Sequence, residues 1–315
     1  MNQLELLEVK EFSAKKRFGS STDGGYVIGM LNTMYDCYIS CGISDEESFT
    51  RDFLQSHSYL KKEHCYAFDG TIADYPWRYT KEIQFFRKNI GANNDDRHCN
   101  LHDLINKYNN IFLSIDIEGG EYEWLESLTV DQLRKFKQIA IEFHGMCGND
   151  HWGSIELKTK CLAKLNQSHF IIHAHGNNNG PIVHSIPNVL ELTYVNRDWF
   201  SQEPPKNKIP FPIDSLDYPN LPTKADYSLH TYPFVSCAFA RIVIGDSKTR
   251  TKEIQLPWAL KKPLYFFQDD IDCKDKFIYS INDKTLSVTR VDIPDGYTKT
   301  PDGWGQPLLA YYSLD

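Results

Sequence analysis

The chain has 315 residues, and none of its apolar runs approaches the roughly 20 residues needed to span a membrane. Its first residues, MNQLELLEVKEF, are acidic and amphipathic, and they lack the charged start and apolar centre of a signal peptide. The sequence therefore predicts a cytoplasmic protein with no membrane span.

Cysteine pairs of the kind that bind zinc are also missing. The chain has eight cysteines, but no two of them form a C-x-x-C pair. Cys37 and Cys41 lie in or beside an apolar run, where a small buried thiol fits well. We therefore expect neither a structural zinc site nor a disulfide framework.

Positive charge is scarce as well. The formal net charge is −8, and the only short basic run near a candidate site is Lys15-Lys16-Arg17. A protein of this charge does not favour the phosphate backbone, so we expect no nucleic-acid partner. The rest of the composition is that of an ordinary globular protein, and the length allows a large core and a second domain.

Strand-like runs alternate with helix-like runs through the first two-thirds of the chain. Strands are expected at 37–43, 64–71, 111–117, 138–145, 170–176 and 188–197, and helices at 45–57, 101–108, 120–136 and 155–168. Strands separated by helices predict βαβ units and a parallel sheet. The last two strands have no helix between them, so we expect an antiparallel pair at the sheet edge.

The character of the sequence changes after residue 200. Residues 201–222 are rich in proline and have little periodicity, so we expect an extended surface arm or linker there. Residues 232–315 contain short β-like runs separated by Asp, Gly, Lys and Pro. We predict two domains, an α/β domain at 1–222 and a small β-rich C-terminal appendage at 223–315.

Polar residues and glycine gather at the predicted strand ends. Ligands bind at the carboxyl ends of the strands in such a sheet. The residues expected there are Gly42, Asp69, Asp116, Glu142 with His144, and His175 with Asn177, Asn178 and Asn179. Because the pattern recurs at five strand ends, it indicates a binding site more strongly than any one residue does.

The stretch IFLSIDIEGGEYEWL at 111–125 carries four acids directly after a buried strand. A buried carboxylate needs a partner, which for Asp116 is a metal ion, a substrate hydroxyl, a cationic side chain or backbone N–H groups. Glu121 and Glu123 fit the first turn of the following helix, where the helix dipole favours acids. We expect Asp116 and Glu118 to face the chemistry, and Glu121 and Glu123 to serve the helix.

Six segments occur in an order that is informative: RFGSSTDGGYVI (17–28), YISCGISDEESF (38–49), YAFDGT (66–71), the stretch at 111–125, QIAIEFHG (138–145) and IPNVLELTYVNRD (186–198). Together they resemble the FkbM-type, S-adenosylmethionine-dependent methyltransferases. FPIDSLDYPN (211–220) is similar to the proline-rich tail of that family, so the resemblance covers residues 15–222. It implies a class I (Rossmann-like) methyltransferase sheet and transfer of a methyl group, typically to an oxygen.

The resemblance implies S-adenosyl-L-methionine as the cofactor. Gly42 allows close approach at a helix N-terminus after the first strand, and Asp69 ends the second strand, where an acid can accept both ribose hydroxyls. The loop after the first strand lacks the G-x-G-x-x-G fingerprint, which disfavours a nicotinamide dehydrogenase. The expected cofactor contacts are Asp23, Gly42, Asp69, Gly70, Asp116 and Glu118.

Methyl transfer to an oxygen needs a group that removes the hydroxyl proton. Glu142 and His144 are two residues apart, so their side chains lie on the same face of a strand. We expect His144 to be the general base, oriented by Glu142. Alternatively, a divalent metal held by Asp116 and a neighbouring acid such as Glu142 orients the acceptor and lowers its pKa. The sequence leaves these two mechanisms open.

Three functions are consistent with these residues. The first is an O-methyltransferase acting on a sugar, a nucleotide-linked sugar or a glycan, with Glu118, His175 and Asn178 on the substrate side. The second is a methyltransferase acting on another small metabolite. The third is a binding protein on a degenerate methyltransferase fold. The β-rich appendage is expected to cover the acceptor pocket, bind a longer glycan, form a homodimer contact or cap one sheet edge.

Overall fold

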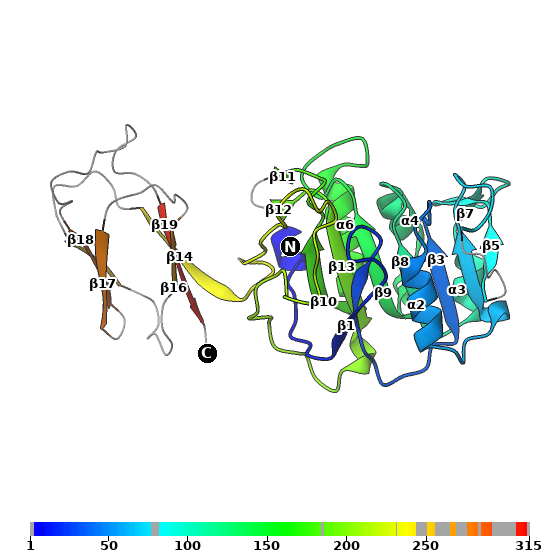
Figure 1. Cartoon of the computed structure of the whole chain (residues 1–315), viewed down its shortest axis with the longest axis horizontal. Coiled ribbons are helices and arrows are strands. Elements are labelled where there is room, and N and C mark those ends of the chain that lie inside the picture. Colours follow the sequence, from blue (N-terminus) through cyan, green and yellow to red (C-terminus); the bar gives the residue numbers. More distant parts are fainter. Residues whose placement is uncertain are drawn as a thin grey trace. The chain divides into compact units, whose positions relative to one another are not determined.

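The structure is a computed structural model of the whole chain (Figure 1). It describes residues 3–76, 82–183, 186–230 and 232–243, and five further strands in the C-terminal part, with side chains described as far as residue 236. The chain divides into two compact units, Met1–Val235 and Ser236–Asp315. The first unit contains all of the predicted site residues.

A seven-stranded sheet forms the centre of the first unit (Figure 1). Its strands, in spatial order, are β10 (His169–Gly176), β13 (Leu190–Asn196), β9 (Phe136–Phe143), β8 (Ile111–Ile115), β3 (Cys37–Cys41), β4 (Cys65–Phe68) and β5 (Gln84–Phe86). Neighbouring strands from β9 to β5 are parallel, whereas β13 runs antiparallel to both β9 and β10. The fold is therefore α/β with a mixed sheet, and the predicted antiparallel edge pair is confirmed.

The two strands at the middle of the sheet place the candidate site. β3 (CYISC) and β8 (IFLSI) are apolar runs in which every residue is buried, as expected for strands covered on both faces. Their register pairs Cys41 with Ile115. Gly42 and Asp116 therefore leave the two strands side by side, and the Asp116 N–H donates to the Cys41 carbonyl over 2.9 Å.

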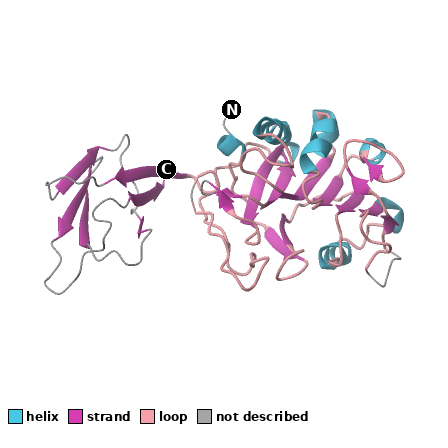
Figure 2. Cartoon of the chain, turned by 90° about the horizontal axis from the view of Figure 1, so that it is seen from above, coloured by secondary structure: helices cyan, strands magenta, loops and turns pink. Residues whose placement is uncertain are grey.

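Helices cover both faces of the sheet, with most of them on one side (Figure 2). On that side α4 (Glu121–Ser127) contacts α6 (Ile155–Asn166), which also contacts α1 (Gln3–Leu6) and α5 (Val130–Leu133). α3 (His102–Lys107) contacts α5. On the other face, α2 (Ser48–Ser56) packs beside the hairpin of β1 (Lys15–Phe18) and β2 (Tyr26–Gly29). The aromatic core under α2 and the hairpin includes Phe18, Tyr38, Phe49, Phe53 and Phe112.

The helical stretch expected at 120–136, in which Asp131 and Gln132 suggest a second start, is two helices, α4 and α5. Thr129 forms a capping box with Gln132: its hydroxyl accepts from the Gln132 N–H, and the Gln132 side chain accepts from the Thr129 N–H. A capping box satisfies the first N–H groups of a new helix and so starts one. The second start is confirmed, and the expected helical stretch is too long only at its end, because Phe136 already belongs to β9.

Short elements complete the first unit. β6 (Asn89–Ile90) pairs with β7 (His98–Cys99), and β11 (Ile182–Val183) pairs with β12 (Ile186–Pro187). Two 3-10 turns, η1 (Lys62–His64) and η2 (Arg197–Trp199), precede β4 and follow β13. The six cysteines of this unit are all free. None of the helices in the described ranges combines the length and hydrophobicity that a bilayer crossing requires.

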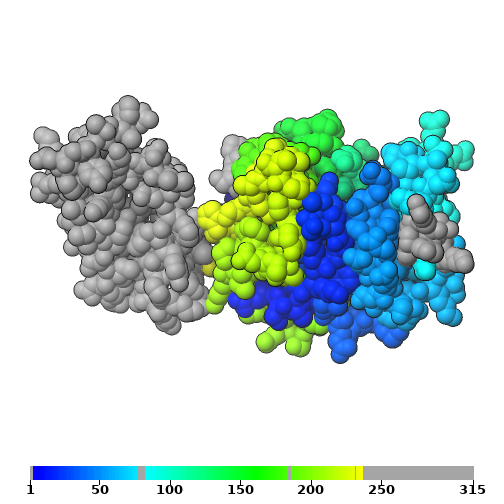
Figure 3. Space-filling view, in the orientation of Figure 1, coloured from blue at the N-terminus to red at the C-terminus, as the bar shows by residue number. Residues whose placement is uncertain are grey.

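The proline-rich segment packs against the sheet instead of extending from it. Phe211 and Leu229 are buried and exchange two backbone hydrogen bonds. Asp217 is also buried and bonds His173 of β10 over 2.8 Å. Figure 3 shows the yellow surface of this segment against the blue of the N-terminal residues. Most side chains of 201–222 are at the surface, as predicted, but the segment is not a linker, because the compact unit continues past residue 222 to Val235.

The second unit is built from strands. β14 (Cys237–Val243), β19 (Pro307–Ser313) and β16 (Tyr265–Gln268) form one antiparallel sheet. β15 (Thr251–Gln255), β18 (Thr285–Val291) and β17 (Lys276–Asn282) form another. No helix occurs among the residues of this unit that the structure describes. The β-rich character is as predicted, although β15, a polar TKEIQ run, is not one of the runs expected as strands.

Candidate functional site

A cavity of about 580 Å³ opens at the carboxyl ends of β3, β4 and β8. The strand order changes direction at β3, which has β4 on one side and β8 on the other. An open α/β sheet binds its ligands at such a switch point, because the loops from the two neighbouring strands separate there. The turn between β1 and β2 closes one wall with Thr22, Asp23 and Gly24.

The cavity wall is strongly acidic. No lysine, arginine or histidine lines it among the residues that the structure describes. An enclosed site with charges of one sign concentrates a ligand of the opposite charge. The six carboxylate side chains in the lining are Asp23, Asp45, Glu46, Asp69, Asp116 and Glu118.

Gly42 lies where only glycine fits. Its φ is +75°, and a Cβ atom there would lie 1.5 Å from the carbonyl oxygen of Asp116. Both the left-handed backbone and this contact exclude a side chain. The predicted cofactor contact at Gly42 does line the cavity, and the glycine lets the loop after β3 pass directly over the end of β8.

Asp69 lines the cavity but is already saturated with hydrogen bonds. Oδ2 accepts from the N–H groups of Ile43 and Ser44, and Oδ1 accepts from the N–H and hydroxyl of Thr71. Burial would raise the pKa of Asp69, but these hydrogen bonds lower it below its ordinary value. Asp69 therefore ties the loops after β3 and β4 together. Gly70 does not line the cavity, and its N–H donates to Asn89.

At the carboxyl ends of β8 and β9 lies a group that we call the carboxylate–histidine cluster: Asp116, Glu118, Glu121, Glu142 and His144. The His144 side chain is only 8 % exposed. Its Nε2 atom lies 3.3 Å from Glu118, 3.8 Å from Glu142 and 4.0 Å from Asp116. The structure thus brings together the four predicted residues Asp116, Glu118, Glu142 and His144.

Glu121 belongs to this cluster as well as to its helix. It is fully buried, and Oε1 accepts from the N–H groups of Ile117 and Gly119 and from Nδ1 of His144, the last over 3.1 Å. The hydrogen bond that orients His144 therefore comes from Glu121, not from Glu142 as expected. The side chain points back from the first turn of α4 toward the end of β8, as helical side chains do.

The electrostatics of the cluster follow from its burial. Burial, opposed by His144 and reinforced by Glu118 and Glu121, raises the pKa of Asp116 to about 7. Burial would lower the pKa of His144, but Glu121, Asp116 and Glu118 raise it above its ordinary value. Two like charges 4 Å apart repel by about 4 kcal/mol at an effective dielectric constant of ~20. Four carboxylates around one imidazole therefore favour additional positive charge.

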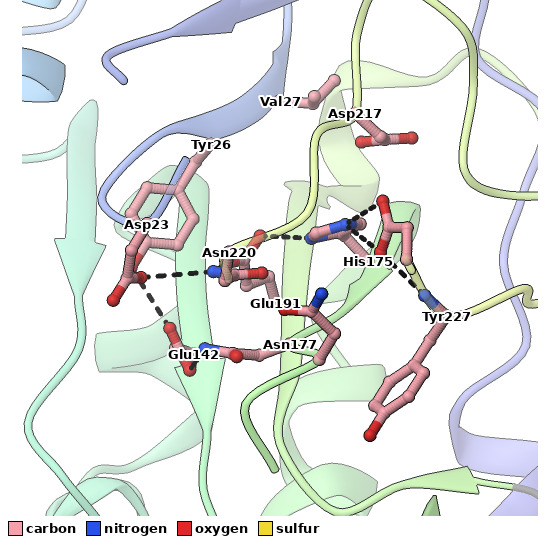
Figure 4. Close-up of polar contacts among 12 residues, drawn as sticks. Asp23, Tyr26, Val27, Glu142, His175, Asn177, Glu191, Asp217, Asn220 and Tyr227 are labelled. Carbon is pink, nitrogen blue, oxygen red and sulfur yellow. Dashed lines mark hydrogen bonds and ion pairs between the residues drawn. The ribbon is translucent and has the colours of Figure 1, made fainter. Parts of the chain in front are cut away.

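A second acidic group, formed by Asp23, Glu142 and Glu191, adjoins the first (Figure 4). Its oxygens already have donors. Asn220 donates to Asp23 and Glu191 over 3.2 and 2.6 Å, and Asn177 donates to Glu142 over 2.8 Å. The Tyr26 hydroxyl joins the two groups, because it lies 3.3 Å from Asp116 and 3.5 Å from Glu142.

His175 and Asn178, expected on the substrate side, are not among the cavity-lining residues. His175 is held from both sides, by Glu191 over 2.9 Å and by Asp226 over 3.0 Å. Burial would lower its pKa, but these carboxylates raise it to about 10. Asn178 is fully buried and bonds backbone groups of Leu221, Lys224 and Ala225. Both residues therefore hold residues 221–226, at and just after the end of the proline-rich segment, against the sheet.

Several residues of the site were not predicted from the sequence. Glu191 offered a usable signal, since it is a charged residue inside an otherwise apolar strand, LELTYVN. Asn220 offered none, because it lies in a segment without periodicity. Comparison of the chain with protein-family models, curated proteins and solved structures gives no match.

Proposed function

We propose that the chain is an S-adenosylmethionine-dependent O-methyltransferase that acts on a hydroxyl of a sugar or glycan. The observation that carries this proposal is the acidic cavity at the carboxyl ends of β3, β4 and β8. S-adenosylmethionine carries a sulfonium and an ammonium group, and both favour nearby carboxylates. A dinucleotide, by contrast, would bring a pyrophosphate into a cavity with six carboxylates in its lining.

The described residues supply distinct parts of such a site. Asp23 and Asp116 both line the cavity and offer carboxylates to the cationic groups of the cofactor. Asp69 contributes charge and shapes the loop, since each of its oxygens already accepts two hydrogen bonds. Gly42 keeps the floor free of a side chain.

The acceptor would bind on the side of the carboxylate–histidine cluster. In-line displacement needs the acceptor oxygen held about 3 Å from the methyl carbon and a group that takes its proton. Asp116 and Glu118 line the cavity and also approach His144, so this cluster connects the cofactor side with groups that can take a proton. The mechanism is transfer to oxygen assisted by this cluster.

Two alternative functions are consistent with the same cavity. A methyltransferase acting on another small metabolite would use the same cavity with a different acceptor. A degenerate fold that only binds a ligand is favoured by the saturation of Asp69, which leaves that carboxylate without a free lone pair for a ribose.

The first experiment is calorimetric titration of the purified chain with S-adenosylmethionine. We expect binding that weakens by about tenfold or more in Asp116→Ala, because the neighbouring carboxylate is lost. Glu123→Gln is the matched control, since Glu123 is exposed on the same segment and lies outside the cavity. Absence of binding in the unmodified chain would contradict both proposed methyltransferase functions.

The second experiment assigns the acceptor. The chain is incubated with S-adenosylmethionine labelled in the methyl group and with a panel of nucleotide-linked sugars and free glycans. Transfer to a sugar hydroxyl supports the proposal, whereas transfer only to other metabolites supports the first alternative. Cofactor binding without transfer to any member of either class supports the binding protein.

A further inference from the structure

His144 has one ring nitrogen in use and one that faces only acids. Nδ1 lies 3.1 Å from Glu121, so the neutral imidazole donates from Nδ1 and keeps a lone pair on Nε2. No described residue forms a hydrogen bond with Nε2, although three carboxylates lie within 4.0 Å of it. The surrounding carboxylates favour a proton on Nε2, and a metal ion that took the place of this proton would meet the same lone pair and the same carboxylate oxygens.

The oxygens facing Nε2 are incompletely satisfied. Oδ1 of Asp116 is buried and has no hydrogen-bond partner among the described residues. Oε1 of Glu142 accepts one hydrogen bond, from Asn177. A buried carboxylate oxygen without a donor is unfavourable unless a cation or a water molecule meets it.

We propose that Asp116, Glu118, Glu142 and the Nε2 atom of His144 bind one divalent metal cation. Nε2 lies 3.3–4.0 Å from one oxygen of each of these three carboxylates. Asp116 and His144, together with Glu121, offer ligand atoms that all lie within 4.8 Å of one another. Three carboxylates and one imidazole suit Mn²⁺ or a similar divalent ion. This site stands on the geometry of the cluster and does not depend on the proposed reaction.

Glu121 would support the ion through His144, because it bonds the other ring nitrogen, Nδ1. A metal-binding histidine commonly donates its other ring N–H to a carboxylate, which fixes the tautomer and the ring orientation. Glu121 accepts that hydrogen bond and is itself held by two backbone N–H groups. Its burial at 0 % exposure keeps the pair rigid.

The neighbouring group of Asp23, Glu142 and Glu191 is a poorer cation site. Asn220, Asn177 and His175 already donate to its oxygens. A cation there would have to compete with these hydrogen bonds. Glu142 is shared: its Oε1 accepts from Asn177 and is also the oxygen 3.8 Å from Nε2 of His144, so one lone pair of that oxygen is left for an ion.

The cation would refine the proposed reaction if both proposals hold. Asp116 and Glu118 belong to the cavity wall, so an ion at the cluster would lie beside a bound acceptor. Such an ion lowers the pKa of a coordinated hydroxyl, and His144 would then be a ligand instead of a free base.

Trp152 lies beside the proposed cation site, where its indole can report a bound ion by luminescence. Its ring centroid lies 5.9 Å from that of His144, and its Nε1 donates to the Glu118 carbonyl over 3.1 Å. Its indole also packs against Gly119, where a Cβ atom would lie 1.6 Å from the ring. A lanthanide ion bound at the cluster would therefore accept excitation energy from this indole.

The test uses the full chain and Mn²⁺ alone, with bound and free ion separated by electron paramagnetic resonance. We expect one site per chain, with affinity about tenfold or more weaker in Asp116→Asn and in His144→Gln. Glu121→Gln should weaken binding by roughly 10- to 100-fold without removing a ligand. Glu123→Gln, on the exposed side of the same helix, should bind as the unmodified chain does.

Terbium luminescence gives an independent readout. Tb³⁺ added to the full chain should emit on tryptophan excitation, and Trp152→Phe should lose this emission while Mn²⁺ still binds. The proposal is overturned if the chain binds no Mn²⁺ at millimolar concentration, or if Asp116→Asn and His144→Gln bind it unchanged while circular dichroism shows them folded. It is also overturned if Asp23→Asn alone abolishes binding, because the ion would then occupy the neighbouring group.

Discussion

Glu142 of β9 stands directly opposite Glu191 of β13 in the antiparallel register, and both side chains are buried. Asn177 donates to the first carboxylate, and Asn220 and His175 donate to the second. Like charges in directly opposed positions destabilise a sheet. A pair of this kind is expected where a binding site, not stability, determines the residue type.

Replacement of Glu142 by glutamine should therefore stabilise the metal-free protein. The amide keeps an acceptor for Asn177 and cannot ionise, whereas burial, Asp116 and Glu191 raise the pKa of the Glu142 carboxyl well above its ordinary value. We expect a gain of up to about 1 kcal/mol. This corresponds to a rise in melting temperature of roughly 2–4 °C for a unit of this size. Glu123→Gln is the control and should melt unchanged. A melting temperature that falls in Glu142→Gln would show that the two charges do not oppose folding.

Alanine at Gly42 should be much more harmful than alanine at another glycine with positive φ. Gly42→Ala places Cβ 1.5 Å from the Asp116 carbonyl oxygen, and we expect a loss on the order of 4 kcal/mol or a failure to fold. Gly148 has φ +82° and open space around it, so Gly148→Ala should cost only about 1–2 kcal/mol of backbone strain. Urea denaturation measures both. Equal losses would mean that strain alone, without the contact, decides Gly42.

His175 should make stability depend on pH in the alkaline direction. Its pKa of about 10 in the folded chain lies above the ordinary value of about 6.5. Its contribution is therefore complete below pH 6.5 and is lost as the pH rises toward 10. The melting temperature of His175→Gln should fall furthest below that of the unmodified chain near pH 6, and the difference should shrink by pH 10.

His173 is the matched control for that experiment, because it lies two residues earlier on the same strand and also bonds a carboxylate. Burial lowers its pKa against the pull of Asp217, so its contribution is lost as the pH falls. The difference between His173→Gln and the unmodified chain should therefore change with pH in the opposite direction. If the two variants show the same trend, the assignment of His175 as a buried cation is incorrect.

Glu118 should be dispensable for folding and necessary for the cation. It is a non-glycine residue at φ +55°, and its side chain is 83 % exposed. Glu118→Gly relieves the left-handed strain, so stability should stay within about 1 kcal/mol of the unmodified chain. Mn²⁺ affinity should fall nonetheless, because one carboxylate is lost. Unchanged affinity in the folded variant would remove Glu118 from the ligand set.

The centre of the sheet could be predicted from the sequence because it depends on local pattern. Buried runs such as IFLSI are followed by an acid, and this combination predicts both a strand and a strand end with chemistry. The antiparallel β10–β13 pair followed from the absence of a helix between two apolar runs.

Tertiary contacts account for what could not be predicted. Glu121 already had a sufficient explanation in the helix dipole, and only the packed structure shows that it also holds His144. The position of His175 at a strand end predicts a substrate contact, but its actual partner Asp226 lies 51 residues away in the sequence. The composition of that later segment gives no sign of burial. Thr129 and Gln132 did carry a signal for the break between α4 and α5.

The attachment of the proline-rich segment has a practical consequence for shortened versions of the chain. Asp217, Asn220 and Asp226 bond His173, Glu191 and His175 of the sheet from beyond its last strand, β13. Leu229 pairs with Phe211 farther along the same part of the chain. A chain that stopped at residue 222 would leave His175 without Asp226 and Phe211 without Leu229. Residues 1–235, the whole first unit, are therefore the fragment expected to fold with its acidic cavity intact.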